Sequence, residues 1–202
     1  MSTSDTGSLV LIGAGGHARV VLESARLEGW RVDGFFDDSP DASLDDLSHL
    51  GVIGSVESGA RAILCVGDVV ARRRLLDAVA WEHASVTHPS AILSEESAVG
   101  EGVFIGPRVV VNPRARVGAH AILNSGCIIE HDASVGPNSH VAPGSVVAGG
   151  VSIGADALLG IGCRVLPGVR IGDGCVVGAG SVVNRHIDDG ERVAGVPAQS
   201  LS

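Results

Sequence analysis

The sequence of 202 residues contains no tyrosine, only three phenylalanines and only two tryptophans, although 45% of its residues are hydrophobic. Aromatic side chains fill much of the volume of an ordinary core. Their scarcity argues against a β-sandwich and favours a core of stacked aliphatic side chains. Basic residues are also few, with 14 Lys and Arg against 23 Asp and Glu, for a net charge of −9. This balance argues against nucleic acid or an anionic membrane as the main partner.

Long apolar segments and paired cysteines are missing as well. No window approaches the roughly 18 apolar residues of a membrane span, and the start MSTSDTGSLVLIG has no basic region typical of a signal peptide. We therefore expect a cytoplasmic protein without a membrane partner. The four cysteines fall in an apolar run or at small repeat positions, which predicts buried thiols and neither disulfides nor zinc ligands; they are Cys65, Cys127, Cys163 and Cys175.

What is present is an aliphatic residue at every sixth position from Val99 to Val183. A small or modest residue follows four positions later, and Gly or Asn follows directly in eleven of the fifteen repeats. A period of six fits neither an α-helix nor an alternating strand, and it is typical of a parallel β-solenoid. Three such hexapeptides make one triangular coil of eighteen residues, in which the aliphatic and small residues point inward.

The first part of the chain has a different pattern. Apolar runs at 9–12, 32–36 and 62–66 predict buried strands, and helical patterns follow the first and third of them, the latter at 69–79. The segment 41–50 is expected to be a loop or a short helix, and the turn at 92–98 is expected to be irregular by one residue. We therefore predict a small Rossmann-like βαβ domain over 1–85, an all-β helix over 86–187, and a C-terminal tail over 188–202.

The first predicted strand leads into the glycine-rich run GAGGHAR at 13–19, and Asp37 follows about twenty residues later. This spacing is similar to a dinucleotide fingerprint, in which a helix N-terminus holds phosphate groups. The domain is only half the usual size, so a single nucleotide or nucleotide sugar is favoured over NAD. The alternative is that the glycines only form a tight turn. His17 is not required by the fingerprint and is placed to donate a hydrogen bond to a ligand.

His131 lies where the repeat breaks its own rule. Glu130 replaces the expected Gly or Asn at this corner, and the local string is Glu130–His131–Asp132. A histidine between carboxylates can act as a general base near neutral pH. The alternative is a solvated corner histidine, as expected for His49, His83, His120 and His186.

Coil arithmetic adds two predictions. Gly149 follows His131 by eighteen residues, so it lies on the same corner one coil further on and leaves space beside the imidazole. Ile161 and Ala179 share a different corner. One prism cannot bring two of its own corners together, whereas neighbouring prisms can, so we expect an active site between subunits, most simply in a homotrimer.

In combination and in this order, the motifs resemble the NeuD/PglD-like sugar O-/N-acyltransferases over essentially the whole chain. The motifs are GAGGHAR, FFDD (35–38), VGD (66–68), HPSA (88–91), NSGCIIEHD (124–132), His140, GIGCRVLP (160–167) and VAGVPA (193–198). The resemblance implies a left-handed β-helix assembled as a trimer, acetyl-CoA as acyl donor, no metal, and a nucleotide-linked amino sugar as acceptor in the making of a surface glycan.

The resemblance also implies residue roles. His131 matches the catalytic base and Asp132 the acid that supports it. The acetyl-CoA site corresponds to His140, Gly149, Ile161 and Ala179, and the nucleotide-sugar site to Gly15, Gly16, His17, Asp37, Asp38 and Gly67. A backbone N–H or His140 would stabilise the oxyanion. Two departures concern Asp132, which can be Glu in relatives, and Ala179, which can be Gly.

Three functions stay open at this point. An N-acetyltransferase acting on a nucleotide-linked 4-amino sugar is favoured, because a free sugar would not need the glycine-rich loop and the Asp37–Asp38 pair. An O-acetyltransferase acting on sialic acid or another hydroxyl is the second. A non-catalytic hexapeptide scaffold of the carbonic-anhydrase-like kind is the third. Since His120, His131 and His140 do not share a corner, the three-histidine zinc site of those anhydrases is not expected here.

Overall fold

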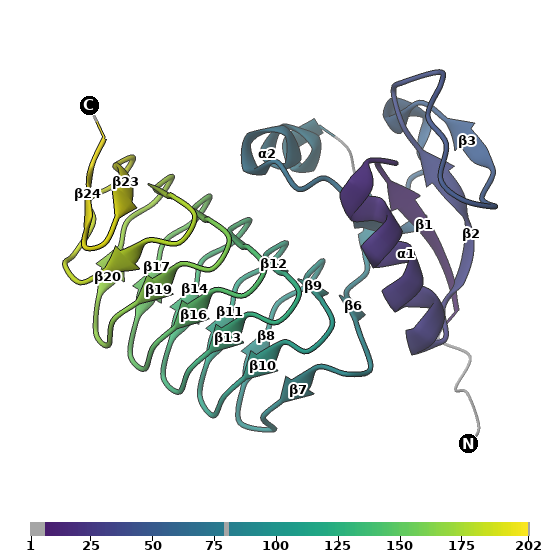
Figure 1. The fold of residues 1–202 in the computed structure, drawn as a ribbon. Helices are drawn as coiled ribbons and strands as arrows, with labels where there is room; N and C mark the ends of the chain where they lie inside the picture. Colours follow the sequence, from purple (N-terminus) through teal and green to yellow (C-terminus); the bar gives the residue numbers. More distant parts are fainter. Residues whose placement is uncertain (1–6, 79–80, 202) are drawn as a thin grey trace.

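The computed structural model describes residues 7–78 and 81–201, and it shows a small α/β part at the N-terminal end of a long parallel β-helix (Figure 1). The α/β part has a five-stranded parallel sheet in the order β3-β2-β1-β4-β5. Its elements are β1 (Ser8–Ile12), α1 (Gly16–Glu28), β2 (Arg31–Phe36), β3 (His49–Gly51), a 3-10 turn (Ile53–Ser55), β4 (Arg61–Leu64), α2 (Val69–Ala78) and β5 (Glu82–His83).

Helix α1 begins directly after the glycine-rich turn and ends at Gly29. Its apolar residues recur at helical spacing, and Val21, Leu22 and Ala25 are buried against the sheet. Gly29 has φ +101°, a conformation that glycine adopts at no steric cost, and its N–H caps the last turn.

The three strands predicted at 9–12, 32–36 and 62–66 are confirmed as β1, β2 and β4. The prediction of a loop or short helix over 41–50 missed β3, which pairs with β2 at the edge of the sheet.

The β-helix consists of strands stacked into three sheets, and all but the last two strands are two residues long and pair in parallel. The first contains β7 (Ile92–Leu93), β10 (Val110–Val111), β13 (Ile128–Ile129), β16 (Val146–Val147), β19 (Arg164–Val165) and β22 (Val182–Val183). The second contains β8 (Ala98–Val99), β11 (Arg116–Val117), β14 (Ser134–Val135), β17 (Ser152–Ile153) and β20 (Arg170–Ile171). The third contains β6 (Val86–Thr87), β9 (Phe104–Ile105), β12 (Ile122–Leu123), β15 (His140–Val141), β18 (Leu158–Leu159), β21 (Val176–Val177), β23 (Arg192–Gly195) and β24 (Ala198–Ser200).

Strand pairing confirms the coil of eighteen residues. Val110 pairs with Ile128 and Ile122 with His140, each eighteen positions apart. The predicted irregularity at 92–98 was wrong, because β7 and β8 already pair in the same register as later coils. The segment predicted to be a tail carries β23, which pairs parallel to β21, and β24, which folds back antiparallel on β23.

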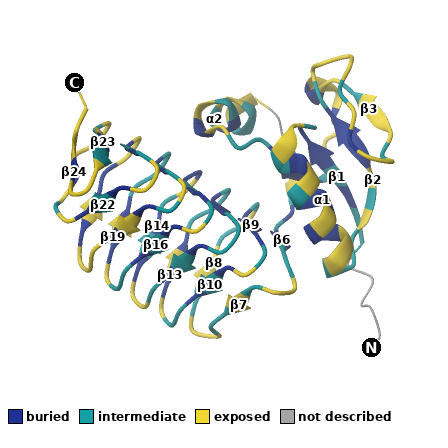
Figure 2. Ribbon diagram, in the orientation of Figure 1, coloured by how far each residue is buried: buried dark blue, intermediate teal, exposed yellow. Residues whose placement is uncertain are grey.

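The core of the β-helix is a column of stacked aliphatic, alanine and cysteine side chains. Figure 2 shows that buried residues recur in coil after coil. All four cysteines are buried and free, as predicted. The two parts of the chain also share a core: Phe104 and Ile122, on the outer face of the third sheet, pack with Leu11, Ala18 and Val21 of the α/β part. This contact places the glycine-rich loop next to the β-helix.

Candidate active site

His131 and Asp132 form a hydrogen-bonded pair on one corner of the β-helix, between β13 and β14. The Nδ1 atom of His131 lies 2.8 Å from Oδ2 of Asp132, and both side chains are exposed. Arg114, one coil earlier, donates from Nε to Oδ1 at 2.6 Å and from Nη2 to Oδ2 at 3.0 Å. The hydrogen bonds from Arg114 and then from His131 hold the pKa of the Asp132 carboxyl far below its ordinary value. Asp132 is therefore ionised at neutral pH and accepts the Nδ1 proton.

The imidazole of His131 lies across Gly149, as the coil arithmetic predicted. A Cβ atom at Gly149 would come within 2.7 Å of both Cε1 and Nε2 of the ring. Only glycine therefore allows this ring position. With Nδ1 bonded to Asp132, Nε2 is the nitrogen left to accept a proton.

His140 lies on a different surface, where the third sheet meets the α/β part. Its Nδ1 atom is 3.0 Å from the carbonyl oxygen of Gly67, and its Nε2 atom is 3.2 Å from Nδ2 of Asn124. Ser125 donates its backbone N–H to Oδ1 of Asn124 at 2.8 Å, so the amide nitrogen of Asn124 faces the ring. These contacts select the neutral tautomer with the proton on Nδ1, and burial lowers the pKa of His140. In this tautomer Nε2 has no proton to donate to an oxyanion.

His17 is partly buried beside His140. Its ring centroid lies 6.3 Å from that of His140 and 5.1 Å from that of Phe104, which it meets edge to face. Burial first, and then repulsion by His140 and Arg72, lowers the pKa of His17 to about 4. Its Nε2 atom is buried and has no hydrogen-bond partner among the described residues. A polar atom left unpaired in this way is suited to a ligand at the glycine-rich loop.

The glycine-rich loop is ordered by one of the aspartates that the sequence singled out. Asp37 accepts the backbone N–H of Ala14 at 2.8 Å through Oδ2. Gly15 and Gly16 are exposed, and a Cβ on either would meet no atom within 4 Å. No acidic residue lies in the first turn of α1, so no carboxylate there competes with a phosphate for the positive end of the helix dipole.

Asp38 supports the next loop. It accepts the backbone N–H of Ile53 at 2.9 Å, at the start of the short 3-10 turn. The sequence predicted Asp37 and Asp38 as nucleotide-sugar contacts, and in the structure each accepts a backbone N–H of a neighbouring loop.

Arg72 joins the two parts of the chain and was not found from the sequence. It is only 1% exposed. Its guanidinium donates to Oδ1 and the carbonyl oxygen of Asn138, both at 2.6 Å, and to the carbonyl oxygen of Val66 at 3.0 Å. The bonds fasten the loop that carries Gly67 to the β-helix, and that loop in turn fixes His140. Nothing in the local sequence marks Arg72, because its partner Asn138 lies 66 residues away along the chain.

The corner that carries Ile161 and Ala179 has little side-chain cover. Both residues are exposed, and the N–H of Gly180 donates to the carbonyl oxygen of Ile161 at 2.8 Å. A Cβ atom added to any of four glycines along this corner would meet no atom within 4 Å; they are Gly126, Gly144, Gly162 and Gly180. Such an edge leaves backbone groups accessible to an extended ligand.

The predicted site residues form two groups in one chain. His131, Asp132 and Gly149 share the corner between the first and second sheets, whereas the glycine-rich loop, Gly67 and His140 lie at the outer face of the third sheet. The β-helix itself stands between the two groups. Two predicted surface histidines also differ from expectation: His83 and His120 are partly buried because their rings pack at 4.4 Å.

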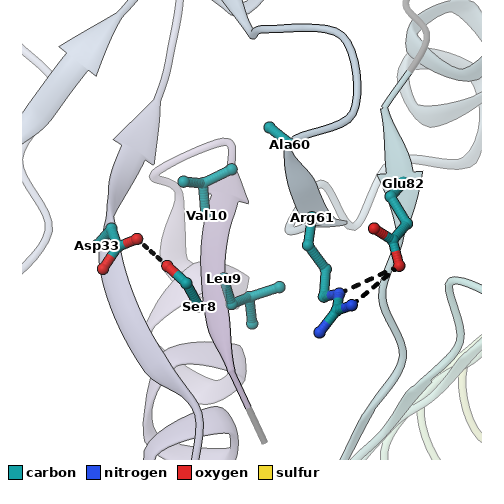
Figure 3. Close-up of a pocket in the computed structure, with 7 residues that line it drawn as sticks. All are labelled: Ser8, Leu9, Val10, Asp33, Ala60, Arg61 and Glu82. Atoms are coloured by element: carbon teal, nitrogen blue, oxygen red, sulfur yellow. Dashed lines mark hydrogen bonds and ion pairs between the residues drawn. The ribbon is translucent and has the colours of Figure 1, made fainter.

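Several cavities border the α/β part. One of about 590 Å³ lies between α2 and the outer face of the third sheet of the β-helix, and Gly67, Asp68, Leu158 and Val176 line it. Another, of about 370 Å³, lies across β2, β1, β4 and β5 of the α/β sheet, where Asp33 bonds Ser8 and Arg61 bonds Glu82 (Figure 3). The first is continuous with the loop that holds His140, since Gly67 lines it.

Within the described residues, no cluster of three or more His, Cys, Asp or Glu is arranged to hold a metal ion. The same residues contain no helix that is long and apolar enough to cross a membrane.

Comparison with known proteins matches both parts of the chain. Residues 8–79 match the family model of the PglD N-terminal domain. Residues 96–131, 114–149 and 150–185 match the bacterial transferase hexapeptide model of six repeats. Comparison with curated proteins gave no match.

Solved structures match along the whole chain. A mutant of perosamine N-acetyltransferase from Caulobacter crescentus, in complex with CoA and GDP-perosamine, is 36% identical, with 98% of each chain covered and a TM-score of 0.90. The acetyltransferase domain of PglB from Neisseria gonorrhoeae FA1090 is 28% identical, with 96% of this chain and 99% of that chain covered and a TM-score of 0.91. WeeI from Acinetobacter baumannii AYE shares the fold at 24% identity, with coverage of 97% and 100% and a TM-score of 0.84. The chain therefore belongs to the NeuD/PglD-like family of hexapeptide-repeat sugar acyltransferases.

Proposed function

We propose that this protein transfers the acetyl group of acetyl-CoA to the 4-amino group of a nucleotide-linked amino-deoxy sugar. The observation that carries the proposal is the His131–Asp132 pair, with Nε2 of His131 directed away from its carboxylate partner and across a glycine. The comparison supports the substrate class, because the enzyme from Caulobacter crescentus was solved with CoA and GDP-perosamine and matches both parts of this chain.

The reaction is a direct transfer without a covalent enzyme intermediate. The nitrogen of the sugar amine attacks the thioester carbonyl, and Nε2 of His131 takes the proton that the nitrogen loses. The C–N bond forms, the C–S bond breaks, and CoA leaves as a thiolate that is then protonated. Asp132 stabilises the imidazolium through its bond to Nδ1. A backbone N–H is the oxyanion donor in this scheme, because the tautomer of His140 leaves its Nε2 without a proton.

The nucleotide binds at the glycine-rich loop. The N-terminus of α1 receives the diphosphate at Gly15 and Gly16, where a side chain is absent and space is open. Asp37 and Asp38 hold the loops around it, and His17 and Gly67 line its inner wall. The acyl donor lies along the bare corner of Ile161 and Ala179.

The complete site requires more than one copy of the chain. His131 and the glycine-rich loop lie on different sides of the β-helix, so a homotrimer that sets the His131 corner of one copy beside the loop of the next would unite them. Exposed apolar residues on two corners fit such an interface: Ile161 is 63% exposed and Leu166 is 44% exposed.

The test is thiol release from acetyl-CoA with a panel of acceptors: GDP-perosamine, UDP- and dTDP-linked 4-amino sugars, and free sialic acid. We expect turnover with one nucleotide amino sugar. Turnover on sialic acid alone would replace the proposal with an O-acetyltransferase, and no thiol release with any acceptor would contradict it.

A matched pair of variants tests the nucleotide site. Gly16→Asp places a carboxylate where the diphosphate is expected, in open space and at a helix start that tolerates it. We expect the KM for the nucleotide sugar to rise at least about tenfold by charge repulsion. Gly16→Ala, which adds no charge, should change it little.

A further inference from the structure

We propose that Arg114 is a positioning residue for the His131–Asp132 pair, fixing the carboxylate so that His131 presents an unprotonated Nε2 to the substrate. The inference rests on the proposed function, in which His131 is the base. It starts from the column of corner residues that contains Glu96, Arg114 and Asp132, each eighteen positions after the last.

The fold sets these side chains one above another. Arg114 and Asp132 both have φ +60°, the left-handed conformation that the corner requires. Adjacent strands of a sheet are about 4.8 Å apart, so equivalent side chains on successive coils project in the same direction within bonding reach. The same arithmetic that placed Gly149 beside His131 therefore places Arg114 beside Asp132.

The guanidinium of Arg114 makes a bidentate contact with Asp132. Its Nε donates to Oδ1 at 2.6 Å and its Nη2 donates to Oδ2 at 3.0 Å, while Nη1 lies 3.9 Å from Oε2 of Glu96. A planar two-point contact fixes the rotation of a carboxylate, which a single ammonium contact does not. Oδ2 of Asp132, held in this way, is the atom that bonds Nδ1 of His131.

One consequence follows for His131. The fixed carboxylate favours the tautomer with the proton on Nδ1, which leaves Nε2 ready to accept the proton of the amine. The charged groups that face the imidazole are Asp132 and Arg114, Glu130, whose Oε2 lies 3.4 Å from the backbone nitrogen of His131, and Glu96 behind Arg114.

The experiment compares Arg114→Ala, Arg114→Lys and the control Arg116→Ala, which removes an exposed arginine two residues away on β11. The first readout is the ¹⁵N NMR signature of the His131 imidazole in the full-length protein, assigned with a His131→Asn variant. We expect the Nδ1–H tautomer in the wild type and in Arg116→Ala. Arg114→Ala should give a mixture of tautomers, and Arg114→Lys an intermediate result. An unchanged tautomer in Arg114→Ala would overturn the proposal.

The second readout is the split between kcat and KM. Arg114→Ala should lower kcat about tenfold through misplacement of the base, with KM nearly unchanged. Arg114→Lys should lose part of kcat, and Arg116→Ala should keep it. A kcat of Arg114→Ala equal to that of Arg116→Ala would also overturn the proposal. The NMR measurement needs no substrate, so a wild type without transferase activity would refute the proposed function and leave the tautomer result to stand by itself.

Discussion

His131 and His140 are nine residues apart, yet the fold gives them opposite chemistry. His131 is on an open corner, with its side chain 61% exposed, and one ring nitrogen is bonded to an ionised carboxylate. His140 is at a buried joint, where Gly67 and Asn124 occupy both ring nitrogens and burial lowers its pKa. The difference shows that a histidine on an exposed corner keeps one ring nitrogen free to accept a proton. A histidine at the contact with the α/β part has both ring nitrogens occupied by structural hydrogen bonds.

The largest expected effect comes from removing the exposed histidine. His131→Ala should lower kcat by about 10²- to 10⁴-fold, the usual contribution of general base catalysis. His131 is exposed and its Nδ1 bond is on the surface, so the midpoint of urea unfolding should stay close to the wild-type value. The measurement is steady-state thiol release at saturating acceptor, and an activity within threefold of wild type would exclude His131 as the base.

Removing Arg72, which holds the α/β part to the β-helix, should lower stability instead of acting directly on the rate. Arg72→Met should lower the free energy of unfolding by about 3 kcal/mol, because the carbonyl oxygen of Val66 and the polar groups of Asn138 lose buried partners. Urea unfolding at pH 7 measures it. Arg74→Met, two residues further along α2 and exposed, is the matched control and should cost little.

Gly149→Ala should disturb the exposed His131–Asp132 pair and leave the surroundings of His140 unchanged. The new methyl group would need the space of the His131 ring, and displacement of a base by about 1 Å can cost on the order of 100-fold in rate. We expect kcat to fall by that order, and the His140 resonances in an NMR spectrum to stay in place. A variant with wild-type kcat would show that the ring is free to lie elsewhere.

The smallest effect concerns pH. Burial lowers the pKa of His17 and of His120 to about 4, and it lowers that of His140 as well. Unfolded histidine binds a proton near pH 6.5, so the unfolded state gains protons first as the pH falls. Stability is therefore full above pH 6.5 and declines toward pH 4, by up to about 1.4 kcal/mol per pH unit for His17 and by less for His120, which solvent screens in part. Urea unfolding between pH 7 and 5 measures the slope, and His120→Asn should flatten it.

Much of the β-helix could be predicted because the same six-residue pattern of aliphatic and small residues repeats in every coil. The position of an aliphatic residue fixes which way its side chain points, and a separation of eighteen fixes its neighbour, so the contact of Gly149 with His131 followed from counting. The same counting would have found Arg114 beside Asp132. It could not find β3, whose three residues have no strong pattern, because only pairing with β2 makes them a strand.

The contact between the α/β part and the β-helix could not be predicted in this way. Arg72, Asn138 and the Gly67 carbonyl meet across long stretches of chain, and no repeat relates them. The sequence analysis assigned Gly67 and His140 as ligand contacts through family resemblance alone, whereas the position of His17 at a helix start also indicated one. In the structure His140 connects the β-helix to the Gly67 loop of the α/β part through a hydrogen bond. This bond determines the tautomer of the ring, which the sequence could not.

The central claim is that the site is shared between copies, and subunit complementation tests it most directly. His131→Ala removes the base, and Gly16→Asp weakens binding at the nucleotide loop, so each variant alone should have a small fraction of wild-type activity at acceptor concentrations well below the wild-type KM. If the base of one copy serves the loop of its neighbour, trimers mixed at equal ratio should recover about one quarter of wild-type activity. No recovery in mixed trimers, confirmed as mixed by mass spectrometry, would place both groups in the same chain and contradict the account.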